Sequence, residues 1–572
     1  HRSPGIVINL VTRRGGNRPT LAGRFYLTDE NFQGKISDAE LVKLNVAGYN
    51  HVKEIRDFGF NAGGALLKDK VWWWGSYGVQ QILTVVATGA SDNTYLTNLD
   101  AKLNFQLIPE NRAEVFIQAG KKEKFGRSSS PSFPSGWNQY GKYHFGSPTI
   151  AIRDEHMFGD NFFVSVRYGF TDAGFGMWPA NDEKMTKITW YNVEKSLYEG
   201  GQTWWFSGRP HSFGVAQIQY FNDNLFGTGS AHEMKIGFEF NNNSATSLGY
   251  EYAAKIMPSY NYYYETLDWN KDGKNDIMRD VLKALYPTNT PLYATFTINE
   301  TRPETTTGTD RLSVYFNDMI SFGRFNATLG LRVDRAKSWW DERTQFGLLE
   351  KEEDFIHDTA MHKDSRENYW SLQNSIMDIE TAKKINSFLP DKKTLTRQEP
   401  KKLWTVFSPR LGLTYDVFGD GKTIAKATYS LFPGGGWGPG AWAPTGMGGW
   451  ASFHWIDWNN DKIINWSELY WRRRGSIQTP YPAFLPDGTF DLSRLDTDKG
   501  TNWGGWDYYV PWAPNTTTYD WDNLKVSLTH EASVSLERQL TRDISVQAQF
   551  SFRRYGRYTQ GLTYYPADKF PN

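Results

Sequence analysis

The segment from Trp404 to Phe432 constrains the fold more than any other part of the chain, because it has the pattern of a β-hairpin with one apolar and one polar face. Apolar residues alternate with polar or small residues from Leu411 to Val417 and again from Ala425 to Leu431, and the turn residues Gly419-Asp420-Gly421 lie between the two arms. Such a hairpin, repeated along a chain with tight turns at one end and long loops at the other, is typical of an up-and-down barrel that crosses a membrane.

Similar hairpins recur along the chain. Their short turns fall at residues 109–111, 159–161, 227–229, 322–324 and 540–543. The alternation is strongest at Phe325–Asp334 and Ile544–Arg553. Charged residues on the polar arms, such as Lys426, Glu531 and Glu537, would be badly placed in a sandwich core and suit a water-filled lumen. The sequence therefore predicts an all-β protein, a transmembrane antiparallel up-and-down β-barrel.

The connections at the opposite ends of the hairpins are long. We expect large external loops at about 174–212, 245–307, 339–403 and 433–523, with a short helix or two in the charged stretch 351–401. The arms between the turns amount to about 15 strands. Because an open sheet edge in lipid leaves backbone groups unpaired, we expect the sequence to stop before the sheet closes, with further strands beyond its C-terminal end.

The composition agrees with a barrel and argues against several other classes. The chain of 572 residues has 63 basic and 63 acidic residues, so no net charge favours nucleic acid. It has no cysteine, which excludes disulfides and thiolate metal sites. It has no window of about 18 apolar residues for a transmembrane helix, whereas barrel strands of about 9 to 11 half-polar residues escape that test. The 24 Trp, 31 Tyr and 36 Phe residues fit the aromatic girdles of a barrel.

Several segments resemble one known family. Residues 5–17, GIVINLVTRRGGN, look like the end of the plug domain of TonB-dependent outer-membrane transporters, where a last plug strand and a Gly-rich turn lead into the first barrel strand. Residues 56–77, RDFGFNAGGALLKDKVWWWGSY, and residues 407–429, FSPRLGLTYDVFGDGKTIAKATY, are similar to the Oar-like branch, which carries an amino-terminal carboxypeptidase-regulatory-like domain. Leu536–Leu540 fits the late barrel turn of that branch.

This resemblance implies that residues 1–17 are the end of the plug. It also implies that residues 18–572 form about 15 strands of a barrel that has about 22 when complete. It implies a place in the outer membrane of a Gram-negative bacterium, among lipid and lipopolysaccharide, with energy supplied by the TonB–ExbB–ExbD complex. The turn 418–422 would face the periplasm. The chain departs from the family pattern in two ways. The TonB box and most of the plug would precede His1, and the usual closing strand with a terminal aromatic residue is not seen at Asn572.

The sharpest local motif is residues 457–468, DWNNDKIINWSE, in the last long loop. A calcium loop of the EF-hand type places oxygen ligands at positions 1, 3, 5, 7, 9 and 12 and ends with a bidentate Glu. That series is supplied here by Asp457, Asn459, Asp461, the carbonyl of Ile463, Asn465 and Glu468. Lys462 replaces the usual Gly at the sharp turn. The spacing predicts a structural Ca²⁺ site, and the alternative is a polar surface loop with this spacing by chance.

A second segment, residues 268–280, has a less complete version of the motif. Its candidate Ca²⁺ ligands are Asp268, Asn270, Asp272, the carbonyl of Lys274, and Asp276. Gly273 stands at the sharp turn, but the twelfth position is Arg279, and Asp280 comes one step late. Calcium binding and a plain polar loop are equal alternatives for this segment.

Tryptophans on the Gly-rich last loop form a third candidate site. The ligand-binding candidates are Trp437, Trp442, Trp450, Trp503 and Trp506. Indole rings on a loop suit stacking on sugars or gripping peptide side chains. The alternative is that the rings pack against one another into a compact cap, because a long loop needs a core of its own.

The sequence offers no motif for catalysis. Its 10 His residues form no HExxH pair, and it contains no G-x-S-x-G elbow, so we predict that the chain is not an enzyme. The leading interpretation is a TonB-dependent importer or receptor for a bulky peptide, protein or glycan captured by the external loops, with a surface lipoprotein as a candidate partner. Two alternatives stay open. One is a barrel for adhesion or secretion without import, and the other is a soluble, aromatic-rich, glycan-binding β protein.

Overall fold

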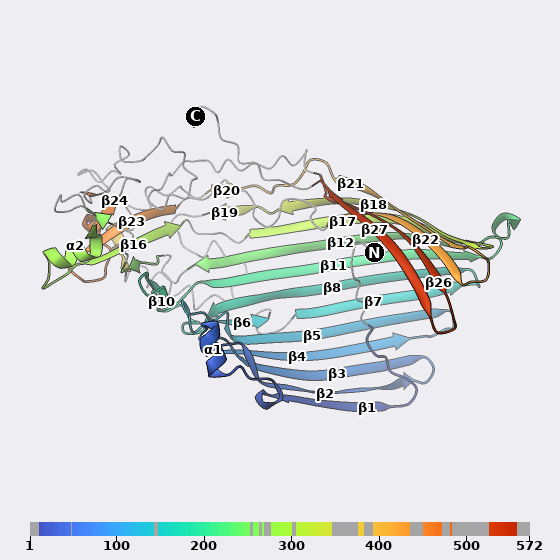
Figure 1. Ribbon diagram of the computed structural model, residues 1–572, viewed down its shortest axis with the longest axis horizontal. Helices are drawn as coiled ribbons and strands as arrows, with labels where there is room; N and C mark the ends of the chain where they lie inside the picture. The colour runs from blue at the N-terminus through green and yellow to red at the C-terminus, as the bar shows by residue number, and fades with distance from the viewer. Residues whose placement is uncertain are drawn as a thin grey trace.

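The computed structural model describes residues 11–46, 48–141, 147–251, 256–261, 266–267, 276–299, 305–345, 376–381, 393–434, 450–471, 481–482 and 525–557. These residues form a 16-stranded sheet, a 7-stranded sheet and two sheets of 2 strands each. Figure 1 shows the long strands of the largest sheet side by side, with the 7-stranded sheet beyond one end of them. We call the largest sheet the wall sheet, and the 7-stranded sheet the loop sheet because its strands come from the predicted external loops.

The wall sheet is antiparallel, and strands that follow one another in the chain are paired almost everywhere. Its strands are β1 (Thr20–Asp29), β2 (His51–Leu67), β3 (Val71–Val85), β4 (Ser91–Phe105), β5 (Asn111–Arg127), β6 (Trp137–Gly141), β7 (Ser147–Phe158), β8 (Phe162–Pro179), β11 (Trp204–Asn222), β12 (Ala231–Glu251), β17 (Thr305–Phe322), β18 (Phe325–Trp340), β21 (Trp404–Asp416), β22 (Thr423–Pro433), β26 (Leu528–Gln539) and β27 (Ser545–Gly556). The predicted all-β class of antiparallel up-and-down strands is confirmed.

Short turns join the wall strands at the end away from the loop sheet (Figure 1). Each predicted turn falls where one wall strand ends and the next begins. In the hairpin of β21 and β22, the two carboxylate oxygens of Asp416 accept the backbone N–H groups of Gly419 and Gly421, at 2.9 and 2.8 Å. Both glycines have positive φ angles, +75° and +71°, which glycine adopts without the strain of a side chain.

The wall differs from the sequence-based expectation in strand number and strand length. The expected count of about 15 is one short of the 16 found, because β6 and β7 both lie between β5 and β8. The strands also extend farther toward the loops. For example, β8 reaches Pro179 and β11 starts at Trp204, whereas we expected a loop over 174–212. The alternation is lost in these extensions because side chains on both faces are covered, as at the successive residues Phe206 and Ser207.

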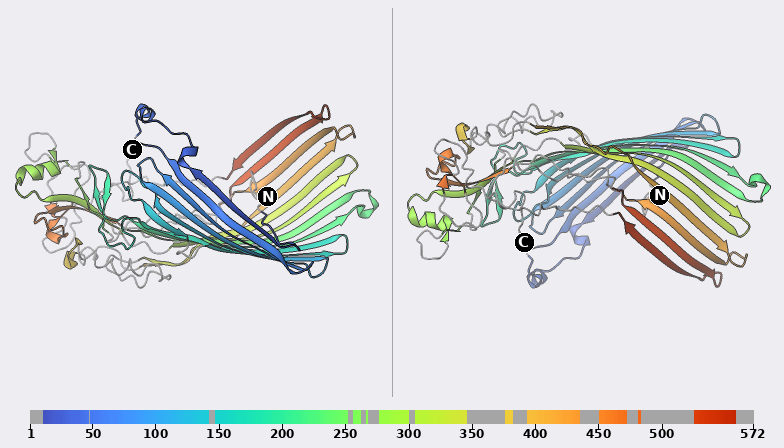
Figure 2. Two further views of the ribbon diagram at one scale, coloured as in Figure 1. Left: turned by 90° about the horizontal axis from the view of Figure 1, so that it is seen from below. Right: turned by 90° about the horizontal axis from the view of Figure 1, so that it is seen from above.

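The two faces of the wall sheet have opposite character. Large apolar side chains are exposed along one face, including Val314, Phe316, Leu329, Leu331, Val534, Phe550 and Phe552. The other face carries ion pairs such as Lys102–Glu114 at 2.9 Å, Lys426–Glu537 at 3.0 Å and Arg553–Glu531 at 2.6 Å. Figure 2 shows the strongly curved and twisted sheet, with its first and last strands rising on two sides. An exposed apolar face suits lipid, and a face of paired charges suits a wet interior.

The N-terminal segment of the described chain lies against the polar face. The Lys102 ammonium donates to the Thr12 hydroxyl at 3.0 Å, and the Asn17 side-chain oxygen accepts from the Asp69 backbone N–H at 3.0 Å and from the Trp72 indole at 2.9 Å. Gly15 is buried here, and a Cβ at this position would meet the Trp73 carbonyl oxygen at 2.1 Å. Only glycine therefore permits the segment to approach the wall this closely.

The edges of the wall sheet are β1 and β27. Within the described residues, β1 pairs only with β2 and β27 only with β26. The strands predicted to close the barrel stay a prediction, and most of the predicted helical stretch 351–401 lies outside the described residues.

The loop sheet is assembled from three connections of the wall, those between β8 and β11, β12 and β17, and β22 and β26. Its strands are β9 (Trp190–Asn192), β10 (Leu197–Glu199), β13 (Ser259–Tyr260), β16 (Leu292–Asn299), β23 (Trp450–Asp457), β24 (Leu469–Trp471) and β25 (Tyr481–Pro482). Their order is β10-β9-β13-β16-β23-β24-β25. Buried apolar side chains form its core, namely Ala294, Phe296, Trp455, Ile456, Ile464 and Leu469.

The remaining elements are short. They are α1 (Asp38–Leu44), α2 (Met278–Leu285), the 3₁₀ helices η1 (Glu30–Phe32), η3 (Leu225–Gly227) and η5 (Trp466–Glu468), and the two small sheets β14 (Thr266–Leu267) with β15 (Asp276–Ile277) and β19 (Arg343–Gln345) with β20 (Lys393–Leu395). In the described part of the chain, no helix has the length and apolarity needed to span a membrane.

Candidate functional site

The predicted calcium residues 457–468 connect β23 to β24 in the loop sheet. The backbone turns at Lys462 with a φ of +61°, the left-handed conformation that glycine usually supplies at this position. Asp457 accepts the backbone N–H groups of Asp461 at 3.2 Å and Lys462 at 2.9 Å. Asn459 accepts from Asp461 at 3.0 Å, and Asp461 from Ile463 at 2.7 Å. These bonds hold the side chains of the first, third and fifth positions along the inside of one tight loop.

Two carboxylates close this loop, and both are buried. Asp457 is 0% exposed and Glu468 is 5% exposed. Glu468 accepts from the Trp455 indole at 3.0 Å and from the backbone N–H of Trp458 at 3.3 Å. Burial raises the pKa of both Asp457 and Glu468, and the neighbouring carboxylates Asp461 and Asp457, respectively, add to the increase. No ion pair to either carboxylate exists among the described residues, so their charges lack a compensating cation there.

The acidic residues of the loop do not gather into a ready metal cluster in this conformation. Among the residues that the structure describes, no group of three or more His, Asp or Glu side chains converges to hold an ion. The oxygens of Asn459, Asn465 and the Ile463 carbonyl complete the predicted ligand series, and the Asn465 amide donates to that carbonyl at 3.1 Å. The backbone is therefore shaped as the motif requires, whereas the Glu468 carboxylate is turned toward Trp455.

The loop also ties distant segments together. The backbone N–H of Ile464 donates to the carbonyl of Ile376 at 2.7 Å, and that of Asp378 donates to the carbonyl of Ile464 at 3.2 Å. The Asn460 amide reaches Asn289 at 2.8 Å. Segments from three connections of the wall thus meet at residues 457–468. No local pattern in the sequence points to these contacts, because each joins residues more than eighty positions apart.

The other predicted site residues are only partly described. In the second motif, Asp276 lies in β15, and Asp268, Asn270, Asp272 and Lys274 lie outside the described residues. Trp437, Trp442, Trp503 and Trp506 also lie outside them, and Trp450 is the first residue of β23. Elsewhere in the loop sheet, the rings of Trp190 and Trp455 lie 6.2 Å apart and Trp455 is buried. The ligand-binding role of the five candidate tryptophans stays a prediction.

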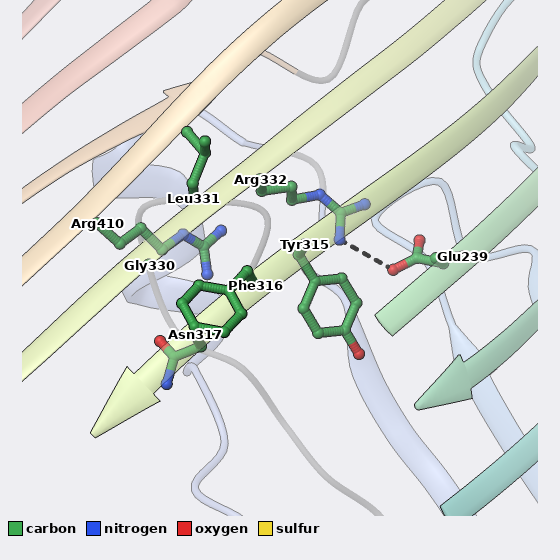
Figure 3. A pocket seen from close by; sticks show the side chains of 8 residues that line it. All are labelled: Glu239, Tyr315, Phe316, Asn317, Gly330, Leu331, Arg332 and Arg410. Atoms are coloured by element: carbon green, nitrogen blue, oxygen red, sulfur yellow. Dashed lines mark hydrogen bonds and ion pairs between the residues drawn. The ribbon is translucent and has the colours of Figure 1, made fainter. Parts of the chain in front are cut away.

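A second candidate site lies on the polar face of the wall, and the sequence analysis did not find it. Arg332 of β18 donates to Glu239 of β12 at 3.2 Å (Figure 3). It also donates to Asp334 at 2.9 Å and to Ser313 of β17 at 2.6 Å. Arg410 of β21 lies beside it, on the next strand. The signal was present in the sequence, because Arg332 and Asp334 both fall on the polar side of the most regular alternating strand.

A comparison with protein families agrees with this architecture. The model of a family described as an outer membrane beta barrel domain matches residues 80–551. A comparison with curated proteins found no match. Among solved structures, the chain is similar to the outer membrane transporter YddB from Escherichia coli, with 12% sequence identity and a TM-score of 0.48. It is also similar to the siderophore receptor PiuA from Acinetobacter baumannii, with 10% identity and a TM-score of 0.43.

These two alignments cover 95% and 97% of this chain, but 52% and 66% of YddB and PiuA. The chain thus spans less than two thirds of the length of either structure. The family match, in contrast, extends over most of the chain and over the wall sheet from β3 to β27. The chain therefore belongs to the outer membrane beta barrel domain family, and its wall lies in the outer membrane.

Proposed function

We propose that this chain is the barrel part of a TonB-dependent transporter or receptor, which captures a bulky extracellular peptide, protein or glycan with its external loops. The observation that carries the proposal is the seating of residues 11–17 against the polar face through Lys102, Asp69 and Trp72. A segment held along the inner wall is what a plug inside the barrel requires. TonB–ExbB–ExbD would then supply the energy that moves the plug.

The loop sheet supports the capture step of this proposal. It joins three connections into one body with its own core, so that it can present a fixed binding surface beyond the membrane. A barrel used only for adhesion would also need such a body, but it would have no use for a polypeptide segment fastened along the inner wall. Neither role needs a catalytic group, in keeping with the prediction that the chain is not an enzyme.

Depletion of ligands from the medium by living cells tests this function. Cells that produce the full-length protein, and matched cells lacking either its gene or TonB, would be given a defined mixture of peptides and oligosaccharides. Mass spectrometry of the medium should show at least one component that only the parent cells remove. Removal that persists without TonB would overturn the importer. Retention on the cell surface in the parent and in the TonB-deficient cells alike would favour adhesion instead.

We further propose that residues 457–468 bind a structural Ca²⁺ ion. The ligands would be Asp457, Asn459, Asp461, the Ile463 carbonyl, Asn465 and Glu468. Two buried carboxylates without a cationic partner among the described residues give the loop a reason to take up a divalent cation. The ion would draw Glu468 away from Trp455. Because the loop joins β23 and β24 to Ile376, the ion would hold the whole loop sheet in one shape.

Scanning calorimetry of the full-length protein in detergent tests the ion. Added CaCl₂ should raise the melting temperature of the loop sheet relative to EGTA, and Glu468→Ala should abolish the shift. Glu468→Gln keeps the side chain's size and hydrogen bonds but removes a charged ligand, so it serves as the matched variant. No calcium-dependent shift in the parent would overturn the site. The second motif, residues 268–280, is tested by counting bound Ca²⁺ ions. Two ions in the parent and one in Asp272→Ala would show that this motif binds calcium, and one ion in both proteins would show that it is a plain polar loop.

A further inference from the structure

Two of the three guanidinium nitrogens of Arg410 lack a hydrogen-bond partner in the described part of the chain. Arg410 projects from β21 onto the polar face, and these two atoms, Nε and Nη2, are buried. The guanidinium lies over the ring of Phe432, with its carbon 5.4 Å from the ring centre. The aromatic ring supports the cation from one side, but it accepts no hydrogen bond in the plane of the guanidinium.

The neighbouring Arg332 shows what a satisfied guanidinium looks like in the same place. Its three nitrogens donate to Asp334, Glu239 and Ser313. Two carboxylates thus compensate Arg332, and no ion pair to Arg410 exists among the described residues. A buried donor without an acceptor costs about 1 to 3 kcal/mol, and more when the group is charged. The barrel keeps such a group on its inner wall, which indicates that something else supplies the acceptor.

The register of three strands builds a pocket next to Arg410. Arg410 pairs with Gly330 of β18, and Gly330 pairs with Asn317 of β17. Because Gly330 has no side chain, a gap separates the side chains of Arg410 and Asn317. A Cβ at Gly330 would lie 3.1 Å from the Asn317 side-chain oxygen and 3.4 Å from the Cβ of Arg410.

The side chain next to this gap leans away from it. Tyr315 donates its hydroxyl proton to Gln217 of β11 at 2.9 Å, and it lies over Gly237 of β12, where a Cβ would meet the ring at 2.3 Å. The resulting pocket has a volume of about 340 Å³ and is lined by Glu239, Tyr315, Phe316, Asn317, Gly330, Leu331, Arg332 and Arg410 (Figure 3). Its charged lining residues are two arginines and one glutamate, so it carries one excess positive charge.

We propose that this pocket is a binding subsite for a carboxylate group, with Arg410 as the cation. A carboxylate is planar and accepts two parallel hydrogen bonds from one guanidinium, which matches the in-plane donors that Phe432 leaves free. The carboxylate comes from one of two sources. It belongs either to a segment of this polypeptide inside the barrel or to a peptide ligand in transit. The second source rests on the proposed function, and the first does not.

Three variants of the full-length protein in detergent separate these sources. Arg410→Ala removes the cation, and Arg410→Lys keeps the charge but lacks the two-pronged donor. Gly330→Val fills the gap and leaves every charge in place. Lys426→Ala is the matched control, because Lys426 lies on the same face in a half-exposed ion pair with Glu537. Retention of heat-modifiable migration in electrophoresis identifies the variants whose wall is folded.

Hydrogen exchange without added ligand tests the first source. If the chain supplies the carboxylate, Arg410→Ala and Gly330→Val speed exchange about tenfold in one acidic segment inside the barrel, while Lys426→Ala does not. Ligand-observed NMR with an acetylated tetrapeptide amide containing one Asp tests the second source. If a peptide ligand supplies the carboxylate, the saturation-transfer signal of this peptide should vanish in Arg410→Ala and Gly330→Val. The same peptide with Asn in place of Asp should give no signal with the parent protein.

A response in either arm supports the subsite. If neither the hydrogen-exchange experiment nor the NMR experiment gives a response, the subsite is overturned. Equal binding of inorganic phosphate and the Asp peptide would also overturn it, because a carboxylate subsite should distinguish the two. Loss of TonB-dependent uptake in cells is a separate readout. A subsite that responds in a protein without such uptake would leave the carboxylate site standing and remove only the proposed function.

Discussion

The wall sheet and the loop sheet pair their backbones in the same way, yet they expose opposite kinds of residue. On the wall, Phe316 is 45% exposed and Phe550 is 66% exposed, and their neighbours on that face are also large and apolar. In the loop sheet, Phe296 is 2% exposed and Trp455 is 0% exposed. The difference reflects the surroundings, because lipid accepts apolar side chains that water rejects.

This contrast means that the two parts of the molecule depend on different forces. The wall is held by ladders of hydrogen bonds between long strands, with lipid against its apolar face. The loop sheet has strands as short as two residues and depends on a packed core, as a soluble domain does. Substitutions should therefore damage one part and leave the other intact.

The largest effect should come from the loop-sheet core. Trp455→Ala should destabilise the loop sheet by about 3 to 5 kcal/mol, because it leaves a cavity at a fully buried position and removes the donor to Glu468. Limited proteolysis of the full-length protein in detergent should then cleave within the loops, while heat-modifiable migration of the wall stays unchanged. Trp458→Ala is the matched control, since Trp458 is 39% exposed. Loss of heat-modifiability in Trp455→Ala would break the proposed independence of the two parts.

A charge on the lipid face tests the other side of the comparison. Val534→Arg, in the middle of β26, should destabilise the wall by about 2 to 4 kcal/mol, because the arginine would face the hydrocarbon. Ser535→Arg, one residue along, places the same charge on the polar face, where a much smaller loss is expected because the arginine does not face the hydrocarbon. Urea unfolding of the full-length protein in lipid vesicles measures both. Equal losses in the two variants would contradict the assignment of the faces.

Sequence periodicity predicts the wall well, because each of its elements is local. The hairpin of β21 and β22, its Gly419 and Gly421 turn, and the polar arms with Lys426 and Glu537 could all be identified from residues near one another in the chain. The ends of the strands could not be identified. Covered side chains on both faces, as at Trp178, remove the alternation that marks a strand.

The loop sheet and the Arg410 pocket could not be predicted, because both depend on non-local pairing. β16 pairs with β23 although more than one hundred and fifty residues separate them, and no motif marks either partner. The pocket exists only because Asn317, Gly330 and Arg410 fall in one row across three strands. The calcium motif is intermediate, since its spacing is local and its anchor to Ile376 is not.

A change of pH should alter the stability of the loop sheet but not that of the wall sheet, without any mutation. Burial raises the pKa values of Asp457 and Glu468 above their ordinary values of 3.8 and 4.5. The folded loop sheet therefore binds protons more tightly than the unfolded chain does, and in EGTA its stability should rise as the pH falls through the raised values. The gain is complete below the ordinary values. The melting temperature of the loop sheet in EGTA should thus increase as the pH is lowered from 7 toward these ordinary values.

With Ca²⁺ bound, the sign of this pH dependence should reverse, because protons compete with the ion for the same carboxylates. The double variant Asp457→Asn, Glu468→Gln should lose both trends, and the melting of the wall should follow neither. A loop sheet that loses stability on acidification in EGTA would contradict the burial of these two carboxylates.

The smallest effect should come from the turn of the hairpin that defines the wall. Asp416→Ala removes the acceptor of two backbone N–H groups, those of Gly419 and Gly421, and should cost the wall about 1 kcal/mol. The loss is modest because water at the membrane surface can replace the carboxylate at this exposed turn. Asp416→Asn keeps one acceptor oxygen and should lose about half as much. Urea unfolding in vesicles resolves the order of the two variants, and proteolysis of the loops should not change in either. Accelerated cleavage in the loops would mean that strain passes along β21 and β22 from the turn to the loop sheet, and the two parts would then share one folding transition.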